Sequence, residues 1–186
     1  YNNASLKQHM RARIEENARD FQAHLHLGIV LFKEEDFEQA KFHLVTAHDM
    51  LPTYTGYPSP ALVLSQIYET EENRGEQLRW LETLLENLQH DYDSAMILAN
   101  AALEDENLDQ ASYFIDRAIQ VDPYRSSVHE LKARYANLVD DPALAVTEYE
   151  VLLKLEINDP VEARTDLAEA YLRNGQVAEA KQSVLY

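Results

Sequence analysis

Seven histidines are the side chains of this sequence best suited to bind a metal or to move a proton. His24 and His26 are two residues apart, and His43 and His48 are five apart. Two ligands on one face of a helix are instead spaced by three or four residues. The spacing therefore favours structural or surface roles for these histidines, and we expect no bound metal.

The motifs of common catalytic sites are also missing. His129-Glu130 begins like the helical motif of zinc proteases, but Ala133 stands where the second histidine is required. Four scattered glycines cannot build a phosphate-binding loop, a dinucleotide fingerprint or a nucleophile elbow. Pairs of carboxylates are expected by chance among 33 acidic residues. We therefore expect no catalytic residue, no cofactor and no enzyme activity within this sequence.

Small residues recur in two columns that advance together along the chain. Both columns repeat at 37, 34, 34 and 35 residues, and the second column follows the first by twelve. A period near 34 predicts pairs of helices joined by short turns, with the small residues where two backbones approach closely. The first column is Gly28, Ser65, Ala99, Ala133 and Ala168, and the second is Ala40, Gln77, Ala111, Ala145 and Ala180.

Apolar residues accompany these columns at helical spacing. Leucines directly precede the small residue of the first column in four of the five units, and apolar residues follow the second column by one helical turn. Pro52 and Pro123 end two of the predicted second helices, because proline lacks the N–H that a helix requires. The sequence therefore predicts an all-α protein.

With these residues the chain resembles the tetratricopeptide repeat (TPR) family, whose pattern is W-x2-L-G-x2-Y, then A-x3-F, then P. The segment 21–54 matches at Leu27-Gly28, Leu31, Ala40, Leu44, Ala47 and Pro52, and the last unit matches at Leu167-Ala168, Tyr171, Asn174-Gly175 and Ala180. The resemblance implies a right-handed α-solenoid. Gln77 and Lys132 depart from it, standing where alanine and leucine are expected.

The repeat period also predicts the domain organisation. We expect a single TPR-like solenoid over residues 1–186, with complete repeats at about 21–57, 58–91, 92–125 and 126–160. Partial repeats are expected at 5–20 and 161–186. Because the sequence has no initiating Met and stops within a predicted helix, we expect a segment of a longer protein.

Composition restricts the partners. The formal net charge is −17, which opposes binding to nucleic acid and to anionic lipid. Many of the acids fall in predicted turns and first turns, where carboxylates cap helices. No apolar run is long enough to insert into a membrane, and without cysteine the sequence does not indicate a compartment.

The resemblance implies a concave groove lined by the first helix of each repeat, and a non-catalytic scaffold or adaptor that binds a peptide or protein segment there. Apolar groove positions disfavour a clamp for a charged peptide C-terminus and favour a partner with apolar anchors. An alternative for the first of these residues is that a preceding helix covers them. The groove residues expected to bind are Leu25, Ile29, Phe32, Leu62, Gln66, Glu69, Met96, Asn100 and Leu103.

Two other functions remain open from the sequence. The chain could be the accessory TPR region of a larger enzyme whose catalytic domain lies outside it. It could also self-associate through exposed apolar ends of the solenoid. The full-length reading frame separates the first alternative from a scaffold, and light scattering at several concentrations tests the second.

Overall fold

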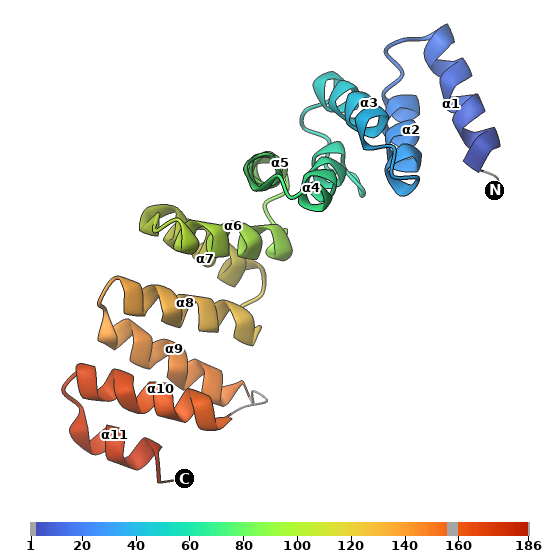
Figure 1. The fold of residues 1–186 in the computed structure, drawn as a ribbon. Helices are drawn as coiled ribbons and strands as arrows, with labels where there is room; N and C mark the ends of the chain where they lie inside the picture. Colours follow the sequence, from blue (N-terminus) through green and yellow to red (C-terminus); the bar gives the residue numbers. More distant parts are fainter. Residues whose placement is uncertain (1–2, 156–159, 186) are drawn as a thin grey trace. The chain divides into compact units, whose positions relative to one another are not determined.

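The computed structural model describes residues 3–155 and 160–185, which form α-helices and no β-strand (Figure 1). The all-α prediction is therefore confirmed. The helices are α1 (Asn3–Glu16), α2 (Phe21–Lys33), α3 (Phe37–Met50), α4 (Pro60–Thr70), α5 (Arg74–Asn87), α6 (Tyr92–Glu104), α7 (Leu108–Val121), α8 (Ser126–Leu138), α9 (Pro142–Lys154), α10 (Pro160–Arg173) and α11 (Val177–Ser183).

The helices belong to two compact units. Unit 1 (Tyr1–Gln89) holds α1 to α5, and unit 2 (His90–Tyr186) holds α6 to α11. Within unit 1, α2 pairs with α3 and α4 with α5, while α1 packs on α2. Within unit 2, the pairs are α6 with α7, α8 with α9 and α10 with α11. That the two units continue one uninterrupted solenoid stays a prediction.

Gly28 shows how close the paired helices come. A Cβ atom added there would lie 2.7 Å from Cγ of Leu44 and 3.3 Å from the carbonyl oxygen of Ala40. Gly28 is on α2 and both neighbours are on α3, so the missing side chain is what allows this approach. The predicted contact between the first two small residues is thus present.

The two small-residue columns are buried in both units, apart from one position. In the second column Gln77, already a departure from the repeat pattern, is only half-buried. Larger side chains complete a core in each unit, for example Leu27, Leu44 and Leu64 in unit 1 and Ile115 and Leu152 in unit 2. Each unit therefore has an apolar interior of its own.

The turn inside each helix pair has one recurring geometry. The second of its three residues takes a positive φ, between 55° and 78°, at Glu35, Glu72, Glu106, Asp140 and Gly175. The next residue donates its N–H to a carbonyl five residues earlier, as Asp36 does to Leu31 at 3.0 Å. These are the two marks of a Schellman turn, which satisfies the last carbonyls of a helix. The positions repeat at 37, 34, 34 and 35 residues, in phase with the small-residue columns.

Side-chain caps begin most of the helices. Asp36 accepts from the N–H of Gln39, and Asp141 accepts from the N–H of Leu144. Asp20, Ser59, Asn73, Asp91 and Asn107 make the same contact to the third residue after them. The residue that ends one Schellman turn often caps the next helix, so the short turns fix both helices of a pair.

Candidate functional site

The first helices of unit 1 present a partly apolar surface, which we call the unit 1 face. It comprises Ile29 and Phe32 on α2 and Leu62, Gln66 and Glu69 on α4. The three apolar side chains are half-buried and rest on the core of unit 1, while Gln66 and Glu69 are exposed. α2 and α4 are in contact, so these side chains belong to neighbouring helices.

Leu25 differs from its neighbours on α2. Only 2% of its surface is exposed, and it belongs to the core of unit 1 together with Met10 of α1. Leu25 is therefore covered in this structure, as the alternative interpretation expects, whereas Ile29 and Phe32 retain exposed surface.

Unit 2 holds the remaining three residues of the predicted groove, all on α6. Met96 and Asn100 are half-buried, and the side-chain amide of Asn100 donates to the carbonyl oxygen of Met96 at 3.0 Å. Leu103 has 2% of its surface exposed and lies in the interior. Unit 2 therefore keeps two of its three predicted contact residues at a surface, and α6 itself contacts the next first helix, α8.

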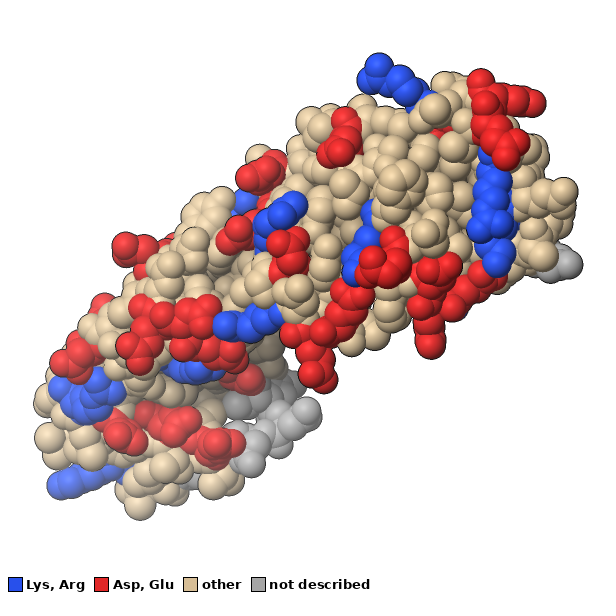
Figure 2. Space-filling view, turned by 45° about the horizontal axis from the view of Figure 1, so that its top comes forward, with Lys and Arg blue, Asp and Glu red and all other residues tan. Residues whose placement is uncertain are grey.

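Acidic side chains outnumber basic ones, 33 to 16, in the sequence. Figure 2 shows Asp and Glu spread over the face drawn, with fewer Lys and Arg among them. Some of these acids are paired, as Glu71 is with Lys41 at 2.9 Å and Asp140 is with Arg173 at 2.6 Å. The excess of acid over base in the whole sequence still leaves a negative field that attracts cationic groups.

A pair of facing histidines joins α2 to α3. The Nδ1 atoms of His24 and His43 lie 2.9 Å apart, and the ring centroids are 5.0 Å apart. Burial, with smaller contributions from the nearby His24 and Arg11, lowers the pKa of His43 to about 4. Burial also lowers the pKa of His24, partly offset by the backbone of Ala18 and the charge of Asp20. Both rings are therefore held neutral at neutral pH.

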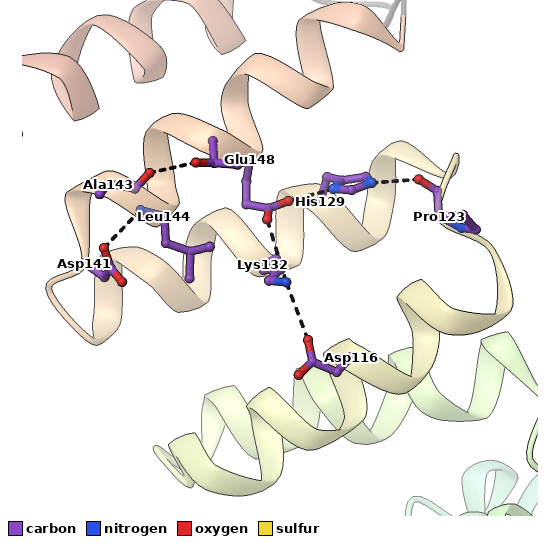
Figure 3. A network of polar contacts seen from close by, with 9 residues as sticks. Asp116, Pro123, His129, Lys132, Asp141, Ala143, Leu144 and Glu148 are labelled. Atoms are coloured by element: carbon purple, nitrogen blue, oxygen red, sulfur yellow. Dashed lines mark hydrogen bonds and ion pairs between the residues drawn. The ribbon is translucent and has the colours of Figure 1, made fainter.

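A second buried histidine, His129, has an oxygen atom beside each ring nitrogen (Figure 3). His129 of α8 places Nδ1 2.7 Å from an oxygen of Glu148 on α9 and Nε2 2.9 Å from the carbonyl oxygen of Pro123. Lys132 lies 3.8 Å from the other Glu148 oxygen and 3.5 Å from Asp116 of α7. Each ring nitrogen of His129 therefore faces an oxygen acceptor.

This network explains two features of the sequence. The first is the His129-Glu130 pair: His129 bonds Glu148 on the next helix, while the adjacent Glu130 is exposed. Lys132, which stands where the repeat pattern has leucine, is the cation between Glu148 and Asp116. The arrangement ties α7, α8 and α9 together. Its His129–Glu148 pair is buried within unit 2, which favours a structural role.

A hollow between α9, α10 and α11 was not foreseen from the sequence. Leu153, Arg164, Leu167, Tyr171, Glu179, Gln182 and Ser183 line it. Tyr171 donates its hydroxyl to Glu150 at 2.6 Å, and this hydrogen bond, with a smaller contribution from burial, raises the Tyr171 pKa to about 12. A tyrosine held so firmly protonated is a hydrogen-bond donor and a poor proton acceptor at neutral pH.

Neither a metal site nor a membrane-spanning helix is found in the described part of the chain. No three His, Asp or Glu side chains among residues 3–155 and 160–185 come close enough together to hold an ion. None of the helices described is both long and apolar enough to cross a bilayer.

Solved structures resemble this fold closely, although sequence comparison finds no relative. Neither protein-family models nor curated protein sequences match the chain. The structure superimposes on YrrB, a TPR protein with an unusual peptide-binding site, with a TM-score of 0.69 over 94% of this chain and 88% of YrrB. The chain has the tetratricopeptide-repeat fold.

Two further structures support the TPR fold. MamA matches with a TM-score of 0.64 over 88% of this chain and 87% of its own. PilF of Pseudomonas aeruginosa matches with a TM-score of 0.55 over 90% of this chain and 75% of its own. The sequence identities to YrrB, MamA and PilF are 14%, 16% and 21%, so the likeness concerns the fold. The TPR assignment made from the repeat spacing is confirmed.

Proposed function

We propose that this TPR chain is a non-catalytic scaffold or adaptor that binds a peptide or protein segment on the first helices of its repeats. The observation that carries the proposal is the unit 1 face, where Ile29, Phe32 and Leu62 keep exposed apolar surface on two adjacent helices. An array of packed helices presents such a surface already formed, so binding orders little of the chain. Met96 and Asn100 offer a second, smaller contact surface in unit 2.

The chemistry of the partner follows from what surrounds the apolar side chains. Half-buried apolar residues suit apolar anchors on an extended or helical peptide. Glu69 is exposed on the same face, and the chain carries a net charge of −17. We therefore expect the bound segment to carry Lys or Arg beside its apolar anchors. The affinity of this chain for the segment should then fall as salt is added.

Binding to peptides tests the proposal. Peptides are selected against the full chain from a random peptide library, and their affinities are measured by fluorescence anisotropy. Replacing Phe32 with serine should weaken binding by about tenfold or more, because a central aromatic anchor contributes strongly to an interface. Leu25 is unsuited to this test, because a polar residue at that buried position would disturb the core of unit 1.

Phe42 provides the matched control. It is a phenylalanine of α3 with 60% of its surface exposed, outside the unit 1 face. Phe42→Ser should leave the affinity unchanged within about twofold, and helicity measured by circular dichroism should be the same in both variants. A folded Phe32→Ser protein that binds the selected peptides as tightly as the wild type would falsify the assignment of this face.

A further inference from the structure

The His24–His43 pair can accept fewer protons than two free histidines. At 2.9 Å the two Nδ1 atoms share one hydrogen, so one ring must present a lone pair to the other. If both rings became imidazolium, two N–H groups would point at each other between α2 and α3. One of the two rings must therefore stay neutral for the helices to remain packed.

The surroundings offer a second proton little compensation beyond the backbone of Ala18, which favours a charged His24. His24 has 4% of its surface exposed, and its Nε2 atom makes no hydrogen bond that meets the usual geometry among the described residues. The charged groups that influence the pair are Arg11 of α1, which repels a charged His43, and Asp20 before α2, which attracts a charged His24. Asp20 forms an ion pair with Arg13 at 2.8 Å, and this neighbouring positive charge weakens the attraction of Asp20 for a charged His24.

The buried histidine of unit 2 has different hydrogen-bond partners. His129 has a carboxylate oxygen at one ring nitrogen and a carbonyl oxygen at the other. His24 has the Nδ1 atom of His43 at one ring nitrogen, and its Nε2 makes no hydrogen bond that meets the usual geometry within residues 3–155 and 160–185. Acid should therefore loosen the α2–α3 pair of unit 1 while leaving the α8–α9 pair of unit 2 in place.

We infer that the His24–His43 contact makes partner binding by the unit 1 face acid-sensitive, so that protonation separates α2 from α3 and releases the bound segment. The inference rests on the proposed function, since it concerns the same face. Ile29 and Phe32 lie on α2, and the ring of Phe32 also contacts Phe37 of α3 at 6.2 Å between centroids. The position of this apolar surface therefore depends on the packing of α2 on α3.

The sign and size of the effect follow from proton linkage. The pKa of His43 is about 4 in the folded protein and 6.5 ordinarily, so the folded state binds fewer protons. The stability that this difference gives is fully present above pH 6.5 and is lost as the pH falls from 6.5 towards 4. For His43 alone, the folding equilibrium of unit 1 should weaken about 20-fold between pH 7 and pH 5.

Amide hydrogen exchange of the full chain measures this directly, without any ligand. Protection factors in α2 and α3 should fall about 20-fold from pH 7 to pH 5, relative to those in α8 and α9. The double variant His24→Gln/His43→Gln should lose this pH dependence. The control His26→Gln, on the exposed side of α2, should keep it. Wild-type protection in α2 and α3 that is equal at both pH values would overturn the inference.

Two further readouts keep the inference testable if the double variant folds poorly. In the wild-type protein, the NMR ring signals of His43 should stay in the neutral form down to pH 5 while unit 1 is folded, and His24 and His43 should not be charged together. Uptake of a proton by both rings near pH 6.5 without loss of protection contradicts the inference. Selected peptides should also bind at least tenfold more weakly at pH 5 than at pH 7, and equal affinity at the two pH values contradicts the link to the unit 1 face.

Discussion

At the scale of single residues, glycine has different consequences at two positions of unit 1. A Cβ atom at Gly28 would meet Leu44 at 2.7 Å, whereas one at Gly75, near the start of α5, has no neighbour nearer than Asn73 Oδ1 at 3.9 Å. Either substitution by alanine gains helix propensity, up to about 1 kcal/mol. Only the change at Gly28 also overfills a packed interior.

We therefore predict that Gly28→Ala is less stable than Gly75→Ala by about 1–3 kcal/mol, the usual cost of overpacking. Trp80 is the single tryptophan of the chain and is buried in unit 1, so its fluorescence during urea unfolding reports on both variants. Equal stability of the two variants would mean that α2 and α3 do not approach as closely as the structure shows.

Glu148 and Glu130 provide a second comparison between similar residues. Glu148 has 5% of its surface exposed and bonds His129, so Glu148→Ala should lower the free energy of unfolding by about 3 kcal/mol. Glu130 is exposed, and Glu130→Gln should change it by less than about 0.5 kcal/mol. Thermal unfolding followed by circular dichroism measures both. Comparable effects of the two substitutions would contradict the network in Figure 3.

Single residues also mark where sequence reasoning stopped. The spacing of the histidines within one helix could not reveal that Glu148, on another helix, lies beside His129. The repeat register put Leu25 and Leu103 on the groove side, and both are buried because packing from neighbouring helices covers them. Contacts between helices decide such positions, and no spacing within one helix reveals them.

At the scale of the elements, the turns within the helix pairs share one backbone geometry although their residue types differ. Four of the five positive-φ positions carry Glu or Asp, and only Gly175 is a glycine. For a residue with a Cβ atom, this left-handed conformation costs roughly 1 kcal/mol or more of conformational energy. The sequence signal for a Schellman turn is glycine, so four of these turns could not be identified by that signal.

Glycine should therefore stabilise such a turn. We predict that Glu72→Gly, at φ 56°, raises the free energy of unfolding of unit 1 by up to about 1 kcal/mol. Glu82→Gly, at an exposed site in the middle of α5, should instead lower it by about 1 kcal/mol. Urea unfolding followed by Trp80 fluorescence distinguishes the two. A loss of stability in Glu72→Gly would contradict the turn geometry.

The sequence does predict the helix pairs, because the same close packing recurs in each pair and requires small residues at a regular spacing. The columns through Gly28 and Ala40 predicted a close contact between α2 and α3, and the structure has it. The match to solved TPR structures confirms the fold, at identities of 14–21%. Small residues at helix contacts are thus a stronger signal here than overall sequence similarity.

At the scale of the whole molecule, the two compact units each contain a core. Unit 1 buries Leu27, Leu44 and Leu64, and in unit 2 Ala136, Ala145 and Leu167 belong to one buried cluster. We predict that fragments 1–89 and 90–186, expressed separately, each form helices and unfold cooperatively. Circular dichroism during thermal unfolding tests this, and a fragment without a cooperative transition would show that its unit is not stable alone.

The central claim is that a peptide binds on the unit 1 face, and methyl NMR of the full chain tests it most directly. During titration with a selected peptide, the methyl signals of Ile29 and Leu62 should shift the most. Those of Val45 on α3 and Leu81 on α5 should change little, because these residues lie outside that face. Large shifts at Val45 and Leu81 with unchanged signals at Ile29 and Leu62 would contradict the account.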